Sequence, residues 1–390
     1  MKDSLSVLII GGTGCISSAV VAECLKNGIS TTIINRGSRP NLIPKDAIFI
    51  KADRSDKKTI KKKIQNKHFD AVVDFLCYTK EELQQSLNLY KSYASQYFFI
   101  SSCAVYDFRK THLGEEESPK VDDRWEYSVN KWAAEETLRS ICKGSECSYT
   151  IIRPSITYGD TRIPYGVTPP YGKHGTIIKR ILNNKPLIRW NQGQNKCNMM
   201  RVEDFARAFV KLIGNENAYN EAFNICSEKA YSYNEVLNLL RKKLNKEIRI
   251  VDLDAQEYSS EVPERKGEII AGRGTDCISS MAKLKKLFPE FKEEYTLETG
   301  IGKTVDAYLS QNCMDGISWE FEGECDRIVA LHDKRVDGRK TYELGFIDYL
   351  NNAQLKDKIN YYIFRHKGRF DSTLLHIMLR IFNKINRMMR

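Results

Sequence analysis

The sequence predicts an α/β protein with a doubly wound parallel sheet, a smaller mixed α/β lobe and a C-terminal helical extension. Two observations predict the sheet. Short apolar runs alternate with stretches of helical periodicity, and the first run ends in a glycine-rich turn that opens a helix. Strands that alternate with helices form a parallel sheet with helices on both faces. Since ligands bind such sheets beyond the carboxyl ends of the strands, the segments that follow each strand hold the candidate site.

The first unit is the run SVLIIGGTGCISSAVVAECLKNG, with a strand expected at 6–10 and a helix at 15–26. A strand, a glycine turn and a helix open a Rossmann-type fold, because glycine lets the backbone approach a pyrophosphate that lies on the helix N-terminus. Strand-to-helix turns without ligands also use glycine, so the turn needs support from the rest of the chain. Its candidate cofactor-binding residues are Gly11, Gly12, Thr13, Gly14, Cys15 and Ile16.

The loops after the second and third strands are expected to approach the adenosine end of a dinucleotide. The second strand, 31–35, ends in Asn35 and Arg36, where NAD-binding folds usually carry an acid and a basic residue accommodates a 2′-phosphate. Arg36, with Arg39 nearby, therefore favours NADP over NAD, although both arginines could equally be solvated. The third strand, 47–50, precedes Asp53 and Arg54, which we expect near the adenine.

Further strands at 69–75 and 97–101, with a helix at 81–93 between them, bring the chain to Ser102. A helix expected at 127–142 then begins with Tyr127 and Lys131, which share one face at a spacing of four residues. A tyrosine with a pKa of about 10 is a poor base, but a nearby ammonium favours its phenolate. Ser102, Tyr127 and Lys131 are therefore the candidate catalytic residues, able to move a proton while a nicotinamide moves a hydride.

These segments resemble the extended short-chain dehydrogenase/reductases, in particular the NAD-dependent epimerase/dehydratase family acting on nucleotide sugars. The matching pieces are GGTGCIS, ISSCAVYD, YSVNK, IIRPSITYGD and RVEDFARAFVKLI. The resemblance implies that Tyr127 is the acid/base, that Lys131 binds the nicotinamide ribose, and that Ser102 holds the substrate oxygen. It places the backbone at Pro154 near the nicotinamide and suggests Arg201 as a substrate-binding residue for the nucleotide diphosphate.

Three positions depart from the family pattern. Ser17 replaces the third glycine of the turn and is expected to crowd the helix slightly against the strand. Asn35 and Arg36 replace the acid that usually selects NAD. Cys103 and Ala104 stand where dehydratases of the family carry an Asp-Glu pair, so the groups needed to eliminate water are missing and a dehydratase is disfavoured.

The expected organisation is an NAD(P)-binding Rossmann domain at 1–160, a substrate-binding lobe at 161–310 interleaved with the core, and a basic, aromatic extension at 311–390. The lobe begins with a loop rich in Gly and Pro whose candidate diphosphate contacts are Arg162, Lys173 and His174. The extension ends in an amphipathic helix at 371–390. This helix could lie on an anionic membrane surface, or it could pack on the body of the protein or on a dimer partner.

Composition describes an ordinary globular protein of 390 residues, with 42% hydrophobic and 28% charged residues. No apolar run approaches the roughly 18 residues of a spanning helix, and no signal peptide is evident. The eleven cysteines include no C-x-x-C pair, so we expect neither a metal site nor a disulfide framework. We expect a cytoplasmic protein, with peripheral contact at the inner membrane face as an option through 371–390.

The net charge of +11 is uneven, because residues 351–390 hold nine Lys or Arg against two Asp. We therefore expect no specific nucleic-acid partner for the fold itself.

The function expected first is NAD(P)-dependent epimerisation of a nucleotide-activated sugar by transient oxidation and re-reduction. An NADPH-dependent reductase of a keto-sugar or another carbonyl is the alternative. A non-catalytic nucleotide- or RNA-associated module on the same fold is a third. A homodimer through the helix that carries Tyr127 is also open.

Overall fold

The computed structural model describes residues 5–367 except 170–171, 311–315, 338–349 and 352. Its centre is a parallel sheet of seven strands in the order β10-β6-β5-β4-β1-β2-β3. These strands are β1 (Ser6–Ile10), β2 (Ser30–Asn35), β3 (Ile48–Lys51), β4 (Phe69–Asp74), β5 (Ala94–Ile100), β6 (Ser148–Pro154) and β10 (Glu221–Ile225). The chain runs outward from β1 in both directions, so the strand order reverses between β1 and β4. Ligands of doubly wound sheets bind at such a reversal point.

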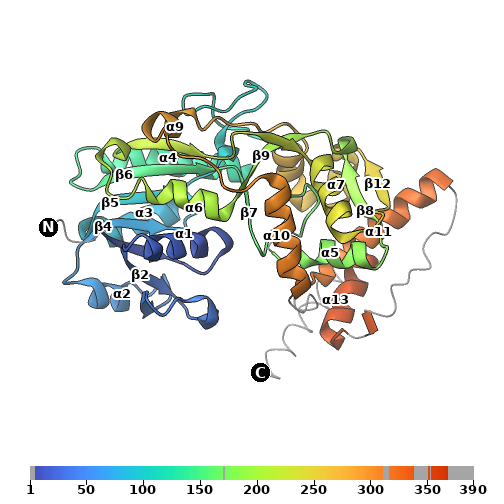
Figure 1. The fold of residues 1–390 in the computed structure, drawn as a ribbon, viewed down its shortest axis with the longest axis horizontal. Coiled ribbons are helices and arrows are strands. Elements are labelled where there is room, and N and C mark those ends of the chain that lie inside the picture. The colour runs from blue at the N-terminus through green and yellow to red at the C-terminus, as the bar shows by residue number, and fades with distance from the viewer. Residues whose placement is uncertain (1–4, 170–171, 311–315, 338–349, 352, 368–390) are drawn as a thin grey trace.

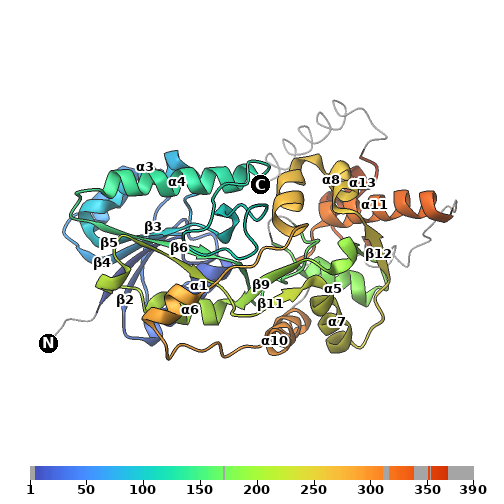
Figure 2. The same ribbon diagram turned by 90° about the horizontal axis from the view of Figure 1, so that it is seen from above.

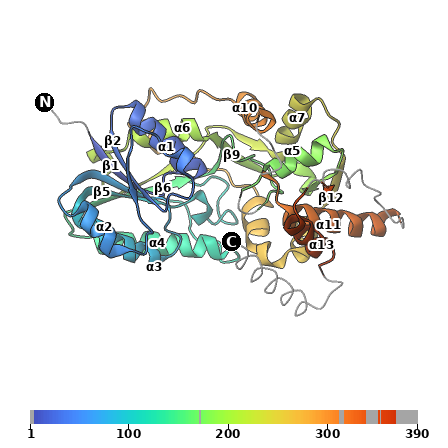
Figure 3. The ribbon, with the colours of Figure 1, turned by 90° about the horizontal axis from the view of Figure 1, so that it is seen from below.

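Helices cover both faces of this sheet, as Figures 2 and 3 show. On one face lie α2 (Lys57–Ile64), α3 (Lys80–Tyr90) and α4 (Glu126–Cys142), and on the other lie α1 (Cys15–Lys26) and α6 (Val202–Val210). Val7 and Ile9 of β1 join the core under α1 and α6, whereas Leu8 and Ile10 join the core on the opposite face. Both sets are buried, which is why the strand has a continuous apolar sequence.

A lobe beside the main sheet is built around two small sheets, β11-β9-β7 and β12-β8 (Figure 1). Its strands are β7 (Ile156–Tyr158), β8 (Leu187–Trp190), β9 (Lys196–Arg201), β11 (Ala230–Ser232) and β12 (Ile250–Leu253). Its helices are α5 (Gly175–Leu182), α7 (Tyr233–Leu244), α8 (Ala255–Glu261) and α10 (Leu297–Ser310), followed by α11 (Trp319–Asp337) and α13 (Leu355–Arg365). Helix α9 (Ala282–Leu287) packs on the main sheet instead. Because β10 lies between these segments in sequence yet pairs with β6, the lobe is interleaved with the core.

Helix α11 is part of the lobe core. Phe321, Cys325, Ile328 and Val329 pack in the same buried cluster as α5 and α7. Its buried acids pair with basic residues near α5, since Asp326 contacts Arg180 and Lys185, and Glu322 contacts the same two cations. Residues 319–337 therefore pack with the lobe. The amphipathic segment at 371–390 lies outside the described residues, and no helix of the described part is long and apolar enough to cross a membrane.

The fold class predicted from the sequence is confirmed, and the expected strands and helices of the Rossmann part lie within a few residues of the observed ones. Leu138 of α4, which could either support a dimer through this helix or pack internally, is fully buried within the chain. The homodimer itself stays a prediction.

Candidate active site

The glycine turn lies between β1 and α1, at the reversal point of the sheet. Gly11 and Gly12 have φ of 109° and 79°, which only glycine adopts without strain. A Cβ on Gly12 would also lie 2.8 Å from Ile33. The first helical hydrogen bond runs from the Ser18 N–H to the Gly14 carbonyl, at 2.9 Å. The amides that precede it point out of the helix end, where they can bind a phosphate. The turn therefore fits a dinucleotide.

Ser17 does more than fill the space of the third family glycine. Its side chain is buried, and its hydroxyl accepts a hydrogen bond of 2.9 Å from the Gly14 N–H. The expected crowding is thus resolved by a cap that holds the turn against the helix. The cap occupies the Gly14 N–H, which a glycine at position 17 would leave without this side-chain partner.

The loop after β2 is tied to the turn through Asn35. Its side-chain amide donates to the Gly11 carbonyl at 2.8 Å, and its carbonyl oxygen accepts from the Gly37 N–H at 2.8 Å. Arg36 and Arg39 are exposed beside it, and Arg39 donates to the Thr13 carbonyl at 3.3 Å. The position that carries an acid in NAD-binding folds is therefore neutral here and flanked by two arginines.

The residues after β3 make local contacts. The Asp53 carboxylate accepts from the Ser55 N–H and hydroxyl at 2.9 and 2.6 Å, and these bonds lower its pKa. Arg54 bonds to the Leu76 carbonyl and pairs with Glu82. Both residues lie beside the coenzyme loops, but their predicted adenine contacts stay a prediction.

Lys131 joins the carboxyl ends of β4 and β5. Its side chain is 3% exposed, and Nζ donates to the carbonyls of Cys77 and Ile100 at 2.6 and 2.8 Å. Burial lowers the pKa of this ammonium to about 8. Nζ also lies 4.8 Å from the ring centre of Tyr78 and 5.8 Å from that of Tyr127.

Tyr127 and Ser102 are brought together, although 24 residues separate them in the sequence. Tyr127 lies in the first turn of α4 and is partly buried, while Ser102 follows β5. Burial raises the pKa of the Tyr127 phenol to about 12, and a hydrogen bond with Ser102 and the charge of Arg162 oppose that rise. The three candidate catalytic residues therefore form one group at the strand ends, beside the glycine turn.

A buried ion pair joins α4, which carries Tyr127 and Lys131, to strand β6. Glu135, two helical turns after Tyr127, accepts from Arg153 at 2.9 and 2.7 Å and from the Ser101 hydroxyl at 2.6 Å. Arg153 and Glu135 are 1% and 0% exposed. The pair fixes α4 to the ends of β5 and β6, and so sets Tyr127 opposite the Ser101–Ser102 segment. The resemblance did not assign Glu135, whose spacing of four residues from Lys131 was the available signal.

Arg162 is the cation of the lobe that enters this site. Its N–H donates to the Gly159 carbonyl at 3.1 Å in a tight turn, and a Cβ on Gly159 would lie 3.4 Å from the Cys15 thiol. The guanidinium is partly buried, and its Nη1 donates to the Thr157 carbonyl at 3.5 Å. Among the described residues it makes no ion pair with a carboxylate, so its charge is available to a ligand.

The two other lobe residues suggested for a diphosphate differ from Arg162. His174 is buried with Nδ1 against the backbone of Ile163, and burial, together with the charge of Arg162, lowers its pKa to about 3. A histidine in this state is neutral, so it supplies no charge to a phosphate. Lys173 is exposed.

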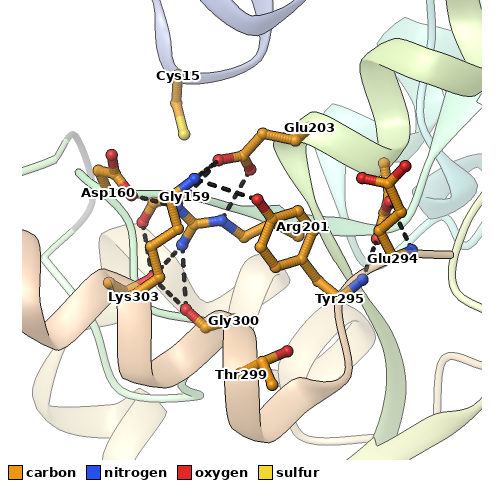
Figure 4. A network of polar contacts seen from close by, with 12 residues as sticks. Cys15, Gly159, Asp160, Arg201, Glu203, Glu294, Tyr295, Thr299, Gly300 and Lys303 are labelled. Carbon is orange, nitrogen blue, oxygen red and sulfur yellow. Dashed lines mark hydrogen bonds and ion pairs between the residues drawn. The ribbon is translucent and has the colours of Figure 1, made fainter.

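Arg201 has a full set of partners within the protein, as Figure 4 shows. The guanidinium is 1% exposed and donates to Glu203 at 2.7 Å, to the Gly300 carbonyl at 3.1 Å, to Thr304 at 2.7 Å and to Asp160. It therefore ties the end of β9 to α10 and to the turn at Gly159. A substrate contact would require it to exchange these partners, and the predicted role in substrate binding stays a prediction.

A Rossmann-type sheet with a Ser–Tyr–Lys group beside its strand ends is typical of the short-chain dehydrogenase/reductases. The family model of the NAD-dependent epimerase/dehydratase family matches residues 7–226, which end just after β10. The chain belongs to this family.

The chain is similar to three proteins of differing function. The chloroplast stem-loop binding protein of 41 kDa b of Arabidopsis thaliana is 28% identical over 58% of this chain and 60% of that protein, so the chain spans less than two thirds of it. The 2′-dehydrokanamycin reductase of Streptomyces kanamyceticus is 20% identical over 75% and 81%. The UDP-glucose 4-epimerase of Thermotoga maritima, solved with UDP-glucose, has a TM-score of 0.61 at 19% identity over 78% and 99%, which supports the fold alone.

Proposed function

We propose that the protein epimerises a nucleotide-activated sugar through transient oxidation by a nicotinamide dinucleotide. The observation that carries the proposal is the position of Tyr127 on α4, where the buried Lys131 ammonium lies 5.8 Å from its ring centre and is bonded to the strand-end carbonyls of Cys77 and Ile100, next to Ser102 after β5. Epimerisation needs a group that removes a hydroxyl proton and later returns it. One solved protein that shares this fold is bound to UDP-glucose, and by that likeness we propose a nucleotide sugar as the substrate class.

When bound, the coenzyme supplies the hydride acceptor and donor, and the glycine turn with Lys131 would hold it. Ser102 donates a hydrogen bond to the substrate oxygen and orients it. The Tyr127 oxygen takes the hydroxyl proton and gives it back from the same atom. The Lys131 ammonium favours the phenolate by its charge, although burial alone keeps the phenol protonated at neutral pH. Arg162 is the residue we assign to the anionic part of the substrate.

Elimination of water is not part of this proposal. Cys103 lies where dehydratases carry an acid, and its buried thiol donates to the Arg153 carbonyl at 3.2 Å. Burial raises the pKa of this thiol to about 12, so it supplies no base at neutral pH. Ala104 beside it has no titratable group.

The second candidate is an NADPH-dependent reductase. It is favoured by the loop after β2, where Asn35 is committed to the turn and Arg36 and Arg39 are exposed. A 2′-phosphate would meet positive charge at this loop. The similarity to a protein named as a reductase agrees with this alternative.

One assay separates the two. The purified protein is incubated with UDP-hexoses and catalytic NAD or NADP, and the sugar products are resolved by chromatography while the absorbance of reduced nicotinamide is followed. The epimerase converts the sugar without a net change in reduced coenzyme. Stoichiometric consumption of NADPH with a carbonyl substrate would instead establish the reductase. Turnover of neither substrate class would remove both proposals.

A further inference from the structure

The β3 edge of the main sheet is strongly basic. The net charge of the whole chain does not reveal this local concentration of Lys and Arg. Residues 36–67, here called the basic edge, hold eleven Lys or Arg against three Asp. They comprise the loop after β2, the edge strand β3 and helix α2, and Figure 1 shows α2 at the end of the molecule opposite α11. All eleven cations are exposed: Arg36, Arg39, Lys45, Lys51, Arg54, Lys57, Lys58, Lys61, Lys62, Lys63 and Lys67.

These cations are not neutralised by the protein. In the described part of the chain, Arg54 is the one member of the set that forms an ion pair, with Glu82. Helix α7 of the lobe offers a direct contrast, because it ends in an equally basic run. There, Arg241 pairs with Glu247 at 3.6 Å, Lys242 with Glu298 at 2.7 Å and Lys243 with Asp306 at 2.7 Å. A basic helix end in this protein can acquire acidic partners, and α2 has none.

The apolar side chains of the basic edge distinguish among anionic partners. Ile60 and Ile64 of α2 are fully buried in the core, so the helix itself has no apolar face left to insert into a bilayer. Leu42 and Ile48 of the neighbouring loop and strand are 49% and 48% exposed, and the vesicle arm of the test below addresses them. One aromatic ring, Phe49 of β3, is 38% exposed, and its edge lies beside Gly37 together with the Lys51 side chain. An exposed ring among lysines is the combination that binds unpaired bases and their phosphates.

We propose that the basic edge binds single-stranded nucleic acid, with α2 contacting phosphates and Phe49 stacking on a base. The partner recognised is a flexible polyanion with planar bases, which RNA and DNA strands both provide. Arg36 and Arg39 also flank the coenzyme loop, but the residues that the test changes lie on α2 and β3, away from the Tyr127 group, so the proposal does not depend on the catalytic one. It is an alternative to the expectation that the fold itself has no specific nucleic-acid partner, which rested on the charge summed over the whole body.

The test measures binding of a fluorescent RNA of about 20 nucleotides, long enough for the known range of site sizes, and of DNA of the same sequence. The full chain is compared with K61Q/K62Q/K63Q and with the matched control R241Q/K242Q/K243Q. Each phosphate contact on a single strand contributes about 0.7 to the salt dependence. We therefore expect the α2 variant to lower the slope of log K against log salt by about 2 and the low-salt affinity by more than tenfold, with the α7 variant unchanged.

Phe49→Ala is expected to weaken binding of the strands by roughly tenfold, since stacking contributes about 1–3 kcal/mol per base, without changing the salt slope. Thermal unfolding of each variant checks that the fold is retained. Equal RNA binding by the α2 variant and the wild type would place the interaction elsewhere, such as in residues 351–390, and would overturn the proposal. The proposal would also be overturned, in favour of a membrane, if the wild type binds neither RNA nor DNA but binds phosphatidylserine vesicles and the α2 variant loses that vesicle binding.

Discussion

The groups around Tyr127 and around Arg201 both lie at strand ends and both contain buried cations, but they differ in how their polar atoms are used. Lys131 is fixed to two backbone carbonyls. The Tyr127 phenol pairs with no carboxylate or carbonyl of the described residues, and burial raises its pKa against the opposing effects of Ser102 and the charge of Arg162. Arg201 instead gives its donors to two carboxylates, a hydroxyl and a carbonyl of its own chain. In the first group the lysine is held by the backbone and the phenol can still bind a ligand. In the second group the donors of the arginine are all used within the protein.

This difference separates residues that serve chemistry from residues that serve packing. A partly buried arginine that has no carboxylate partner among the described residues of its own chain is a candidate for ligand binding, because leaving its charge unpaired is costly. An arginine whose partners come from distant segments holds those segments together. By this criterion Arg162 belongs with Tyr127, and Arg201 belongs with the scaffold. The predictions below test that division.

The largest effect is expected for Tyr127→Phe. The substitution removes the proton-transfer group, whose contribution is typically 10²–10⁴-fold, so we expect kcat to fall by about 10³ with any substrate that the wild type turns over. Coenzyme binding and the unfolding midpoint should be nearly unchanged, because the ring remains. Steady-state kinetics and coenzyme titration measure both. Retention of wild-type turnover would remove Tyr127 from the mechanism.

Arg201→Met is expected to act on stability. Removing one member of a buried ion pair costs about 3–5 kcal/mol, and we expect the lower end, about 3 kcal/mol, because Glu203 keeps Lys303 as a partner at 2.7 Å and Asp160 is half exposed. Denaturant unfolding measures this loss. Arg241→Met, at an exposed pair, is the control and should be nearly neutral. A raised KM with unchanged stability would instead assign Arg201 to the substrate.

Arg162→Gln should give the reverse result. With no carboxylate partner in the described residues, its loss leaves no buried acid unpaired, so the unfolding free energy should change little. If Arg162 meets the anionic part of the substrate, KM should rise by about tenfold, which corresponds to roughly 1.4 kcal/mol. Arg189→Gln is the matched control, because Arg189 is comparably exposed but is paired with Asp252. An unchanged KM would show that the charge of Arg162 faces no ligand.

Sequence patterns predict the features that depend on neighbours in the chain. The strands are recognisable because both of their faces are buried, and Tyr127 and Lys131 because four residues make one helical turn. Features that depend on distant partners escape this reasoning. The mixed composition of residues 319–335 indicates no particular role in the sequence, yet Asp326 is buried against Arg180 and Lys185, whose positions lie more than 140 residues earlier. Arg201 likewise has a partner that the sequence does not indicate, because Thr304 of α10 is 103 residues away.

The smallest effect concerns pH. Burial lowers the pKa of Lys131 to about 8, so half of its charge is lost at that pH. Because the ammonium favours the Tyr127 phenolate, the neutral amine works against proton removal. Near pH 8 we expect kcat to be about half of its value with Lys131 fully protonated, and we expect it to fall further as the pH rises.

An independent readout follows from the same pKa. An unfolded lysine has a pKa of about 10.4, so between pH 8 and that value the unfolded chain binds the proton that the folded chain has lost. The wild type should therefore gain stability relative to Lys131→Met as the pH rises through this window. Buried tyrosines and thiols shift stability in the opposite direction, but they are common to both proteins and cancel in the difference. A kcat that continues to rise through pH 9, together with a flat stability difference, would show that Lys131 keeps its proton and that the site is more open to water than its contacts indicate.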